Sequence, residues 1–457
     1  MFQIAAMPVD LQLPQLQVVM DGAAMHEVFQ RRLPGFAEGR LRLDNLKLMR
    51  MTYTPGKECR IGYTLRVKDL ASGRAGEQIF FAIAAPRSDI ESRYAQARHE
   101  RRVQPEFGPA IFLLPEVHLV LWGFPNDPGL KQLPQLFDQN ALAECIRKFW
   151  DCLHFPSDRK LNSAATILVK YVPELRCTLR HDLRLDEAGE LVIYSKTFQP
   201  GTGGELIFRN MQALWNAPVC RSGEIIIPEP LFFVAEMNTF FMRGLEGVNA
   251  DENLETLDLD RVAAEMGTAL AGIQQCRLED LPDCPEQDAV AEVDDAERIL
   301  GRVAAAYSPR VKTIAETLRE KYTGLTPVPP APMHSAFRIS QFLLVDGKLA
   351  LIDFDDFMLG NPITDVASFV AHLLYWPLKG KITPEQSRSA IRHFCRAYAA
   401  HAPWGLPADV FAWQTAAHLV GKQAKKCIKR TKQRYRDIVD QLLILAADVL
   451  EGRLKLA

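Results

Sequence analysis

The sequence predicts an α+β fold in which two β-rich regions precede a long helical region. Three observations support this prediction. A segment near residue 51 recurs in degenerate form near residue 170. Both copies show period-two alternation of apolar residues between turn residues, which is the pattern of antiparallel strands. From about residue 250 onward the apolar period becomes helical, interrupted by one strand-like stretch.

The repeat is marked by residue types at a constant displacement. Three residues of the first copy recur 118 residues later: Tyr53, Pro55 and Cys59 as Tyr171, Pro173 and Cys177. In both copies an alternating apolar stretch, a Gly-containing turn and a second apolar run follow, and then a helical pattern, at 92–102 and 206–215. This order of elements indicates a duplicated unit. The alternative is a pair of unrelated hairpins that share Pro and Cys by coincidence.

These patterns divide the chain into three expected domains. The first spans residues 1–155, the second β-rich domain spans 164–245, and the helical domain spans 246–457, with a polar linker between the first two. Within the helical domain, Asp346 and Gly347 join two apolar runs and predict an embedded hairpin.

Composition limits the classes of function. The chain is 48% apolar and 24% charged with a net charge of -2, which predicts no global affinity for nucleic acid or anionic membranes. No apolar run approaches the roughly 20 residues of a membrane-spanning helix. The amino terminus lacks the basic start and apolar stretch of a signal peptide. The nine cysteines show no CxxC pair and no zinc spacing, so we expect a cytoplasmic protein with reduced thiols.

The segment 333–370, MHSAFRISQFLLVDGKLALIDFDDFMLGNPITDVASFV, resembles the catalytic core of aminoglycoside phosphotransferases and choline kinases. The matching residues are His334, the hairpin, Ile352-Asp353-Phe354, and Gly360-Asn361-Pro362 followed by Asp365. The resemblance implies a protein-kinase-like two-lobe fold, with a β-rich small lobe and a helical large lobe. An extra α+β domain resembling a second small lobe would precede it.

The resemblance also implies a nucleotide site. Lys196, in the middle of the strand VIYSKTF, corresponds to the phosphate-binding lysine, with Glu205 as its ion-pair partner and Arg338 as a second phosphate contact. Asp353 and Gln341 would hold Mg²⁺, which prefers oxygen ligands and bridges phosphates. Lys196 could instead lie on an edge strand and face water, and Glu205 could be only a helix-capping acid.

The catalytic-base position departs from the family pattern. Ala336 stands where the family has its aspartate, and alanine can neither accept a proton nor orient a hydroxyl. His334 and Asp365 would brace the loop, although Asp365 could be a plain helix cap. Asp355 and Asp356 could supply a substitute carboxylate, or could be solvated turn residues.

The first copy lacks the lysine, because Ile83 aligns with Lys196. We expect residues 1–155 to act through their surface, with Trp122 and Phe124 serving either as core or as a docking face for the second lobe, a protein partner or a homodimer. The basic stretch 422–436 has eight Lys and Arg residues; it is either a solvated helix or a patch for an anionic partner.

Two functions remain open from the sequence. The first is a pseudokinase-like binding or regulatory module that holds ATP and Mg²⁺ with weakened or lost phosphoryl transfer. The alternative is an active ATP-dependent phosphotransferase acting on a hydroxyl of a small molecule or saccharide. A purely structural scaffold would leave Lys196 and Asp353 unconstrained, and no feature predicts specific nucleic-acid recognition.

Overall fold

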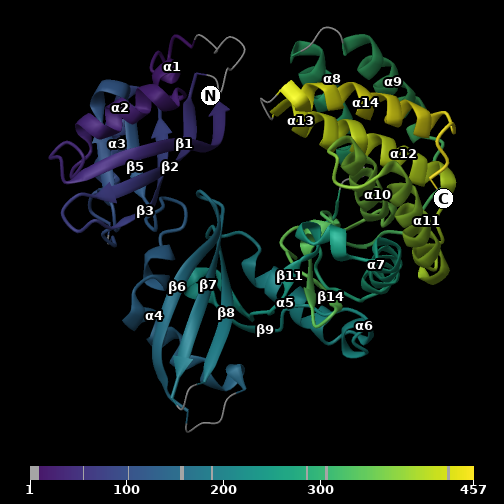
Figure 1. Ribbon diagram of the computed structural model, residues 1–457, viewed down its shortest axis with the longest axis horizontal. Helices are drawn as coiled ribbons and strands as arrows, with labels where there is room; N and C mark the ends of the chain where they lie inside the picture. Colours follow the sequence, from purple (N-terminus) through teal and green to yellow (C-terminus); the bar gives the residue numbers. More distant parts are fainter. Residues whose placement is uncertain are drawn as a thin grey trace. The chain divides into compact units, whose positions relative to one another are not determined.

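The computed structural model describes residues 10–54, 56–100, 102–154, 159–186, 189–284, 287–303, 307–429 and 433–456. The chain divides into two compact units. Unit 1 comprises Met1–Glu205 with Leu231–Gly244, and unit 2 comprises Leu206–Pro230 with Leu245–Ala457. Figure 1 shows the first unit as two sheets with a few helices and the second as mostly helical, which confirms the predicted α+β class.

Unit 1 contains ten strands and four α-helices among its described residues. The strands are β1 Leu41–Thr54, β2 Glu58–Asp69, β3 Ala75–Ala84, β4 Ile111–Leu114, β5 Leu119–Gly123, β6 Leu161–Val172, β7 Arg176–Leu185, β8 Glu190–Phe198, β9 Pro230–Val234 and β10 Thr239–Arg243. The helices are α1 Leu16–Val19, α2 Gly22–Arg32, α3 Arg87–Ala97 and α4 Gln139–Lys148.

The two sheets of unit 1 have the same topology. The first has the strand order β1-β2-β3-β5-β4 and the second β6-β7-β8-β10-β9. In each sheet the last hairpin turns through a short 3₁₀ segment, Pro115–Val117 or Ala235–Met237, followed by one residue in the left-handed region. These residues are His118 at φ 40° and Asn238 at φ 44°. The predicted duplication is therefore confirmed by strand order and by turn geometry.

The tyrosine that recurs in both copies donates its hydroxyl to an aspartate in each of them. Tyr53 donates its hydroxyl to Asp10 Oδ2 at 2.7 Å, and Tyr171 donates to Asp127 Oδ2. The same carboxylate oxygen accepts the backbone N–H of the following turn, from Gly56 at 2.7 Å and from Glu174 at 2.9 Å. In both copies an aspartate ahead of the sheet thus holds the first β-turn.

Helix α4 belongs structurally to the second sheet. Asp138 caps its first turn by accepting from the backbone of Asn140 and Ala141, as Asp21 does at the start of α2. Leu142 and Ile146 of α4 lie in one apolar cluster with side chains of β6, β7 and β8. The expected boundaries at 155 and 164 stay a prediction, and we propose that the second copy begins near Asp127.

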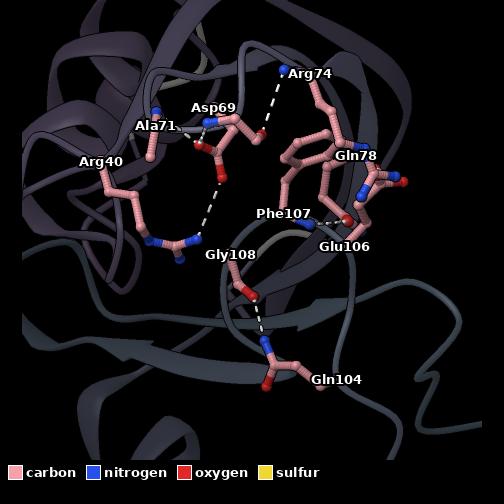
Figure 2. A network of polar contacts seen from close by, with 10 residues as sticks. Arg40, Asp69, Ala71, Arg74, Gln78, Gln104, Glu106, Phe107 and Gly108 are labelled. Atoms are coloured by element: carbon pink, nitrogen blue, oxygen red, sulfur yellow. Dashed lines mark hydrogen bonds and ion pairs between the residues drawn. The ribbon is translucent and has the colours of Figure 1, made fainter.

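Polar contacts fix the turn between β2 and β3 and the loop beside it, as Figure 2 shows. Asp69 accepts from the backbone N–H of Ala71 at 2.9 Å and lies 3.5 Å from the guanidinium of Arg40. In the loop, Gln104 donates to the Gly108 carbonyl at 2.8 Å, and Gln78 accepts from the Phe107 N–H. These contacts tie the end of β2 and the segment before β4 to the first sheet.

Unit 2 is mainly helical. Its α-helices are α5 Gly204–Trp215, α6 Pro218–Arg221, α7 Leu259–Gln274, α8 Gln287–Val303, α9 Ser308–Tyr322, α10 Ile363–Leu378, α11 Pro384–His401, α12 Ala408–His418, α13 Lys425–Lys429 and α14 Gln433–Leu450. Its strands are β11 Val248–Asn249, β12 Ala331–Met333, β13 Phe342–Val345, β14 Lys348–Leu351 and β15 Met358–Gly360. Within the described part of the chain, no helix combines the length and apolar character that crossing a membrane requires.

The predicted hairpin is confirmed as β13 and β14. Val345 pairs with Lys348, so Asp346 and Gly347 form a two-residue turn, and both have positive φ, at 49° and 76°. An Asp-Gly pair suits such a turn because both central residues must adopt the left-handed conformation. The hairpin places the loop before β13 beside the loop after β14.

Candidate functional site

The site in unit 2 is built where the loop after β12 meets the hairpin. Strand β12 pairs with β15 in antiparallel register, Met333 opposite Met358. Phe337, in the loop, is fully buried against Phe369 of α10, with ring centroids 5.9 Å apart. Phe369 in turn stacks on Phe394 of α11 at 4.1 Å. This aromatic packing anchors the loop from 334 to 341 to the helical core.

His334 and Asp365 brace the loop from both sides. The backbone N–H of His334 donates to Asp365 Oδ2 at 2.7 Å, and its Nε2 lies 3.2 Å from the Ile352 carbonyl oxygen. Both side chains are fully buried. Burial raises the pKa of Asp365 to about 6, although the hydrogen bond from His334 acts in the opposite direction. Asp365 is thus buried and bonded to the loop, which favours the loop-bracing alternative over a plain helix cap.

Gln341 and Asp353 lie side by side. The backbone N–H of Ile352 donates to the Gln341 carbonyl at 2.9 Å, and Gln341 Nε2 donates to Asp353 Oδ2 at 3.2 Å. Asp353 has φ 71°, an uncommon conformation for a residue other than glycine. Such backbone strain persists where surrounding structure enforces it, and it clusters at functional sites.

Asp353 and Gln341 carry oxygen atoms that suit Mg²⁺. The Asp353 carboxylate and the amide oxygen of Gln341 are hard oxygen ligands. The described residues contain no group of three or more His, Cys, Asp or Glu side chains that could hold a metal alone. Mg²⁺ commonly takes only one or two protein ligands and completes its shell with water and substrate phosphates. The residues therefore fit a metal that arrives with a nucleotide better than a resident metal.

Ala336 and Arg338 are half-buried residues of the loop. Ser335 precedes Ala336 at φ 62°, and its hydroxyl oxygen is buried without a hydrogen-bond partner among the described residues. The side chain of Arg338 is half-buried. Burial lowers the pKa of His372 in α10 to about 3, and the positive charge of Arg338 adds to this effect. The loop thus presents a guanidinium but no carboxylate at position 336.

Lys196 lies in unit 1, at the centre of the second sheet. Strand β8 is the third of five, and Lys196 pairs across it with Thr178 of β7 and Phe240 of β10. Only 7% of the residue is exposed. The alternative of an edge-strand lysine facing water is therefore wrong. A buried lysine is rare without a role or partner for its charge.

Glu205 is exposed in the first turn of α5, whereas Lys196 is buried. A carboxylate at a helix amino terminus is stabilised by the helix dipole, as in the capping alternative. Its pairing with Lys196 stays a prediction. In the basic stretch, residues 430–432 lie outside the described residues. Two of its lysines face acids of α8, Lys422 at 3.8 Å from Glu292 and Lys425 at 3.2 Å from Asp295.

Trp122 and Phe124 have different environments. Trp122 is core, stacked on Phe81 with ring centroids 5.9 Å apart. Phe124 follows the strand and contacts the second copy, at 5.0 Å from the Tyr171 ring and 5.2 Å from the Phe137 ring. One predicted pair thus divides into a core residue and a residue that joins the two copies.

Sequence reasoning missed a cavity of about 460 Å³ in unit 2. Polar side chains from the loop after β12, the segment around β15, α10, α12 and the segment after α12 line it: Ser335, Asn361, Thr364, Gln414, His418 and Lys422. Glu292, Tyr322, Thr323 and Thr326 line it as well. The available signal was the spacing of Gln414 and His418, two polar residues one helical turn apart in the otherwise apolar run FAWQTAAHLV. The cavity reaches Ser335, the neighbour of Ala336.

Comparison with known proteins gives one family match. Residues 207–404 match the model described as the phosphotransferase enzyme family. No curated protein matches the chain.

Several solved structures are similar at low identity. A choline/ethanolamine kinase family protein from Mesorhizobium loti is 16% identical, covers 62% of this chain and 88% of its own, and has a TM-score of 0.41. The choline kinase LicA from Streptococcus pneumoniae is 12% identical over 68% of this chain and 99% of its own, with a TM-score of 0.41. A thermostable mutant of the aminoglycoside phosphotransferase APH(4)-Ia, solved with ADP and hygromycin B, is 15% identical over 68% and 98%, with a TM-score of 0.44.

Proposed function

We propose that this chain binds ATP with Mg²⁺ and has weakened or lost phosphoryl transfer, because residues 207–404 match the model of the phosphotransferase enzyme family. The family match confirms the resemblance drawn from residues 333–370. The pseudokinase character, the nucleotide and the metal are our proposal. The observation that carries it is the contact of Gln341 Nε2 with Asp353 Oδ2 at 3.2 Å, beside a loop that has Ala336 at the base position.

Each residue of the proposed site has a separate task. Asp353 and Gln341 would hold the Mg²⁺ through their oxygens, and Lys196 and Arg338 would neutralise phosphate charge. Mg²⁺, when bound, bridges phosphate oxygens and offsets the charge that develops in transfer. His334 and Asp365 hold the loop that carries Arg338 and Gln341. Alanine at position 336 offers no oxygen to orient an acceptor hydroxyl, and such a base contributes about 10²–10⁴-fold.

A thermal-shift titration with Mg²⁺ and ATP tests the proposal. Nucleotide at about 100 times Kd should stabilise the protein by roughly 2.7 kcal/mol. Asp353→Asn and Lys196→Met should abolish the shift, because each removes a charge that faces the metal or the phosphates. Methionine preserves most of the volume of the buried lysine stem.

The controls are chosen from the same hairpin. Asp346→Asn changes another aspartate with positive φ, exposed in the β13–β14 turn, and Lys348→Ala removes an exposed lysine next to it. Both should keep the full shift. If millimolar ATP with Mg²⁺ produces no shift in the unaltered protein, the proposal is rejected.

The second candidate function is an active phosphotransferase that acts on a hydroxyl of a small molecule or saccharide. The observation that favours it is the 460 Å³ cavity, which reaches Ser335 and so could orient an acceptor without a base. ATP consumption in the presence of a cell extract, absent in Asp353→Asn, would decide for this candidate. A protein partner or homodimer using residues 1–155, and a cytoplasmic location, remain part of the proposal as the sequence suggested them.

A further inference from the structure

The cavity in unit 2 offers neutral hydrogen-bonding groups. Gln414 and His418 lie one turn apart on α12, and both are buried, with exposed fractions of 7% and 5%. Burial lowers the pKa of His418 well below its usual value, and the charge of Lys422 adds to this effect. The imidazole is therefore neutral. One ring nitrogen is engaged with the backbone of Thr364, and a neutral imidazole has one nitrogen left as an acceptor.

Two further polar residues, Ser335 and Asn361, line the same cavity. The hydroxyl of Ser335 is buried without a partner among the described residues, which is costly unless a ligand or water completes it. Asn361 accepts from the backbone N–H of Ile363 at 3.0 Å through Oδ1, which leaves its amide nitrogen as a donor. The lining thus supplies donors and acceptors of both kinds, spaced around one cavity.

The charge of the lining limits the ligand. Glu292 is the one acidic side chain among the described residues that line the cavity, and its carboxylate is 3.8 Å from the ammonium of Lys422. A polycation would require several carboxylates without internal partners, and this lining offers none. Met333, Met358 and Val328 add an apolar wall, which suits the C–H face of a ring.

Local backbone geometry places Lys422 at this cavity. Residues Leu419–Ala424 form a π-helical segment directly after α12. Such segments insert an extra residue into a helix and are frequent at functional sites. The segment lies beyond residue 404, the last residue of the family match.

We propose that this cavity binds an uncharged, polyhydroxylated molecule of monosaccharide to disaccharide size. Ser335, Asn361, Thr364, Gln414 and His418, which all line the cavity, would hold its hydroxyl groups, and the methionines would pack on its apolar face. The assignment of this ligand as a phosphoryl acceptor rests on the proposed function, because Ser335 adjoins Ala336. Binding itself requires no nucleotide.

The test is calorimetric titration of the full chain, without nucleotide, using myo-inositol, trehalose and the polycation hygromycin B as probes. We expect saturable binding of at least one neutral polyol and none of hygromycin B. Gln414→Leu and Thr364→Val should each weaken polyol binding by about three- to tenfold, the effect of one neutral hydrogen bond. Thr313→Val is the matched control, since Thr313 is exposed on α9 and does not line the cavity.

A variant that changes the charge of the cavity, and with it the expected ligand, gives an independent measurement. Gln414→Glu adds a carboxylate to the cavity, so it should weaken polyol binding and introduce binding of hygromycin B. Absence of polyol binding at 20 mM ligand, or polyol binding that none of the cavity variants alters, would overturn the inference. Polyol binding without stabilisation by ATP would reject the proposed function and keep the inference. Stabilisation by ATP without polyol binding would keep the proposed function and reject the inference.

Discussion

Replacing Tyr171 by phenylalanine removes the hydrogen bond between its hydroxyl and the buried carboxylate of Asp127. Hydrogen bonds to charged groups contribute about 1.5–3 kcal/mol. Three backbone N–H groups remain on this carboxylate, from Gly129 at 2.7 Å, Leu130 at 2.8 Å and Glu174 at 2.9 Å. Because they keep the charge solvated, we expect the lower end, about 1.5 kcal/mol.

The assay is hydrogen exchange read by mass spectrometry on peptides from residues 161–185, since unit 2 need not unfold with unit 1. A loss of about 1.5 kcal/mol should reduce protection there by about tenfold. Tyr53→Phe is the matched control in the first copy, where the bond to Asp10 is only part-buried, so peptides from 41–69 should lose less. Equal losses in the two copies, or no loss in Tyr171→Phe, would refute the argument that burial decides the strength of this contact.

Three further outcomes follow from the unit 2 site. The raised pKa of Asp365, about 6 against 3.8, means that the folded state binds its proton more tightly. Its stabilising contribution is therefore present below about pH 4 and lost as the pH rises through about 6, a change of roughly 3 kcal/mol; urea unfolding from pH 4 to 7 should lose this component in Asp365→Asn, and an unchanged profile would contradict the assignment. Gln341→Leu should raise the Mg²⁺ concentration for half-maximal ATP-dependent stabilisation by about tenfold or more, and an unaltered Mg²⁺ titration would exclude Gln341 as a ligand. Ala336→Asp should increase ATP turnover with an acceptor by up to about 10²–10⁴-fold, whereas turnover equal to that of the unaltered protein would show that more than the base is missing.

Features marked by residue types at a fixed spacing, or by the residues of a short motif, could be predicted from the sequence. The Tyr, Pro and Cys displacement predicted the duplication because equivalent residues hold equivalent turns, as Tyr53 and Tyr171 do. The Asp346-Gly347 hairpin followed from turn chemistry that two positive φ angles require. The proximity of Gln341 and Asp353 followed from the resemblance and from the hairpin between them.

Features assembled from distant segments were not readable. Asp10 and Asp127 lie more than 40 residues from the tyrosines they bind, and no local pattern marks them as partners. The cavity draws its lining from residues between Cys284 and Lys422, so only the packing of helices reveals it. The packing of α4 against the second sheet is of the same kind, because sequence adjacency does not say which sheet an amphipathic helix covers.

The register of the two sheets shows that only the second copy has a lysine at this central position. In the second sheet Lys196 lies between Thr178 and Phe240, and in the first Ile83 lies between Arg60 and Val120. The predicted loss of the lysine is thus confirmed by strand pairing.

The face around Ile83 is also filled. Ile83, Phe81 and Trp122 form one apolar cluster with Ile90 and Ala97 of α3, so the ammonium of a lysine there would be buried among mainly apolar side chains. Arg60, which pairs with Ile83, lies 2.8 Å from Glu58 of its own strand and 3.1 Å from Glu174 in the first turn of the second sheet. The first copy thus has the same sheet topology as the second but an apolar side chain at the lysine position.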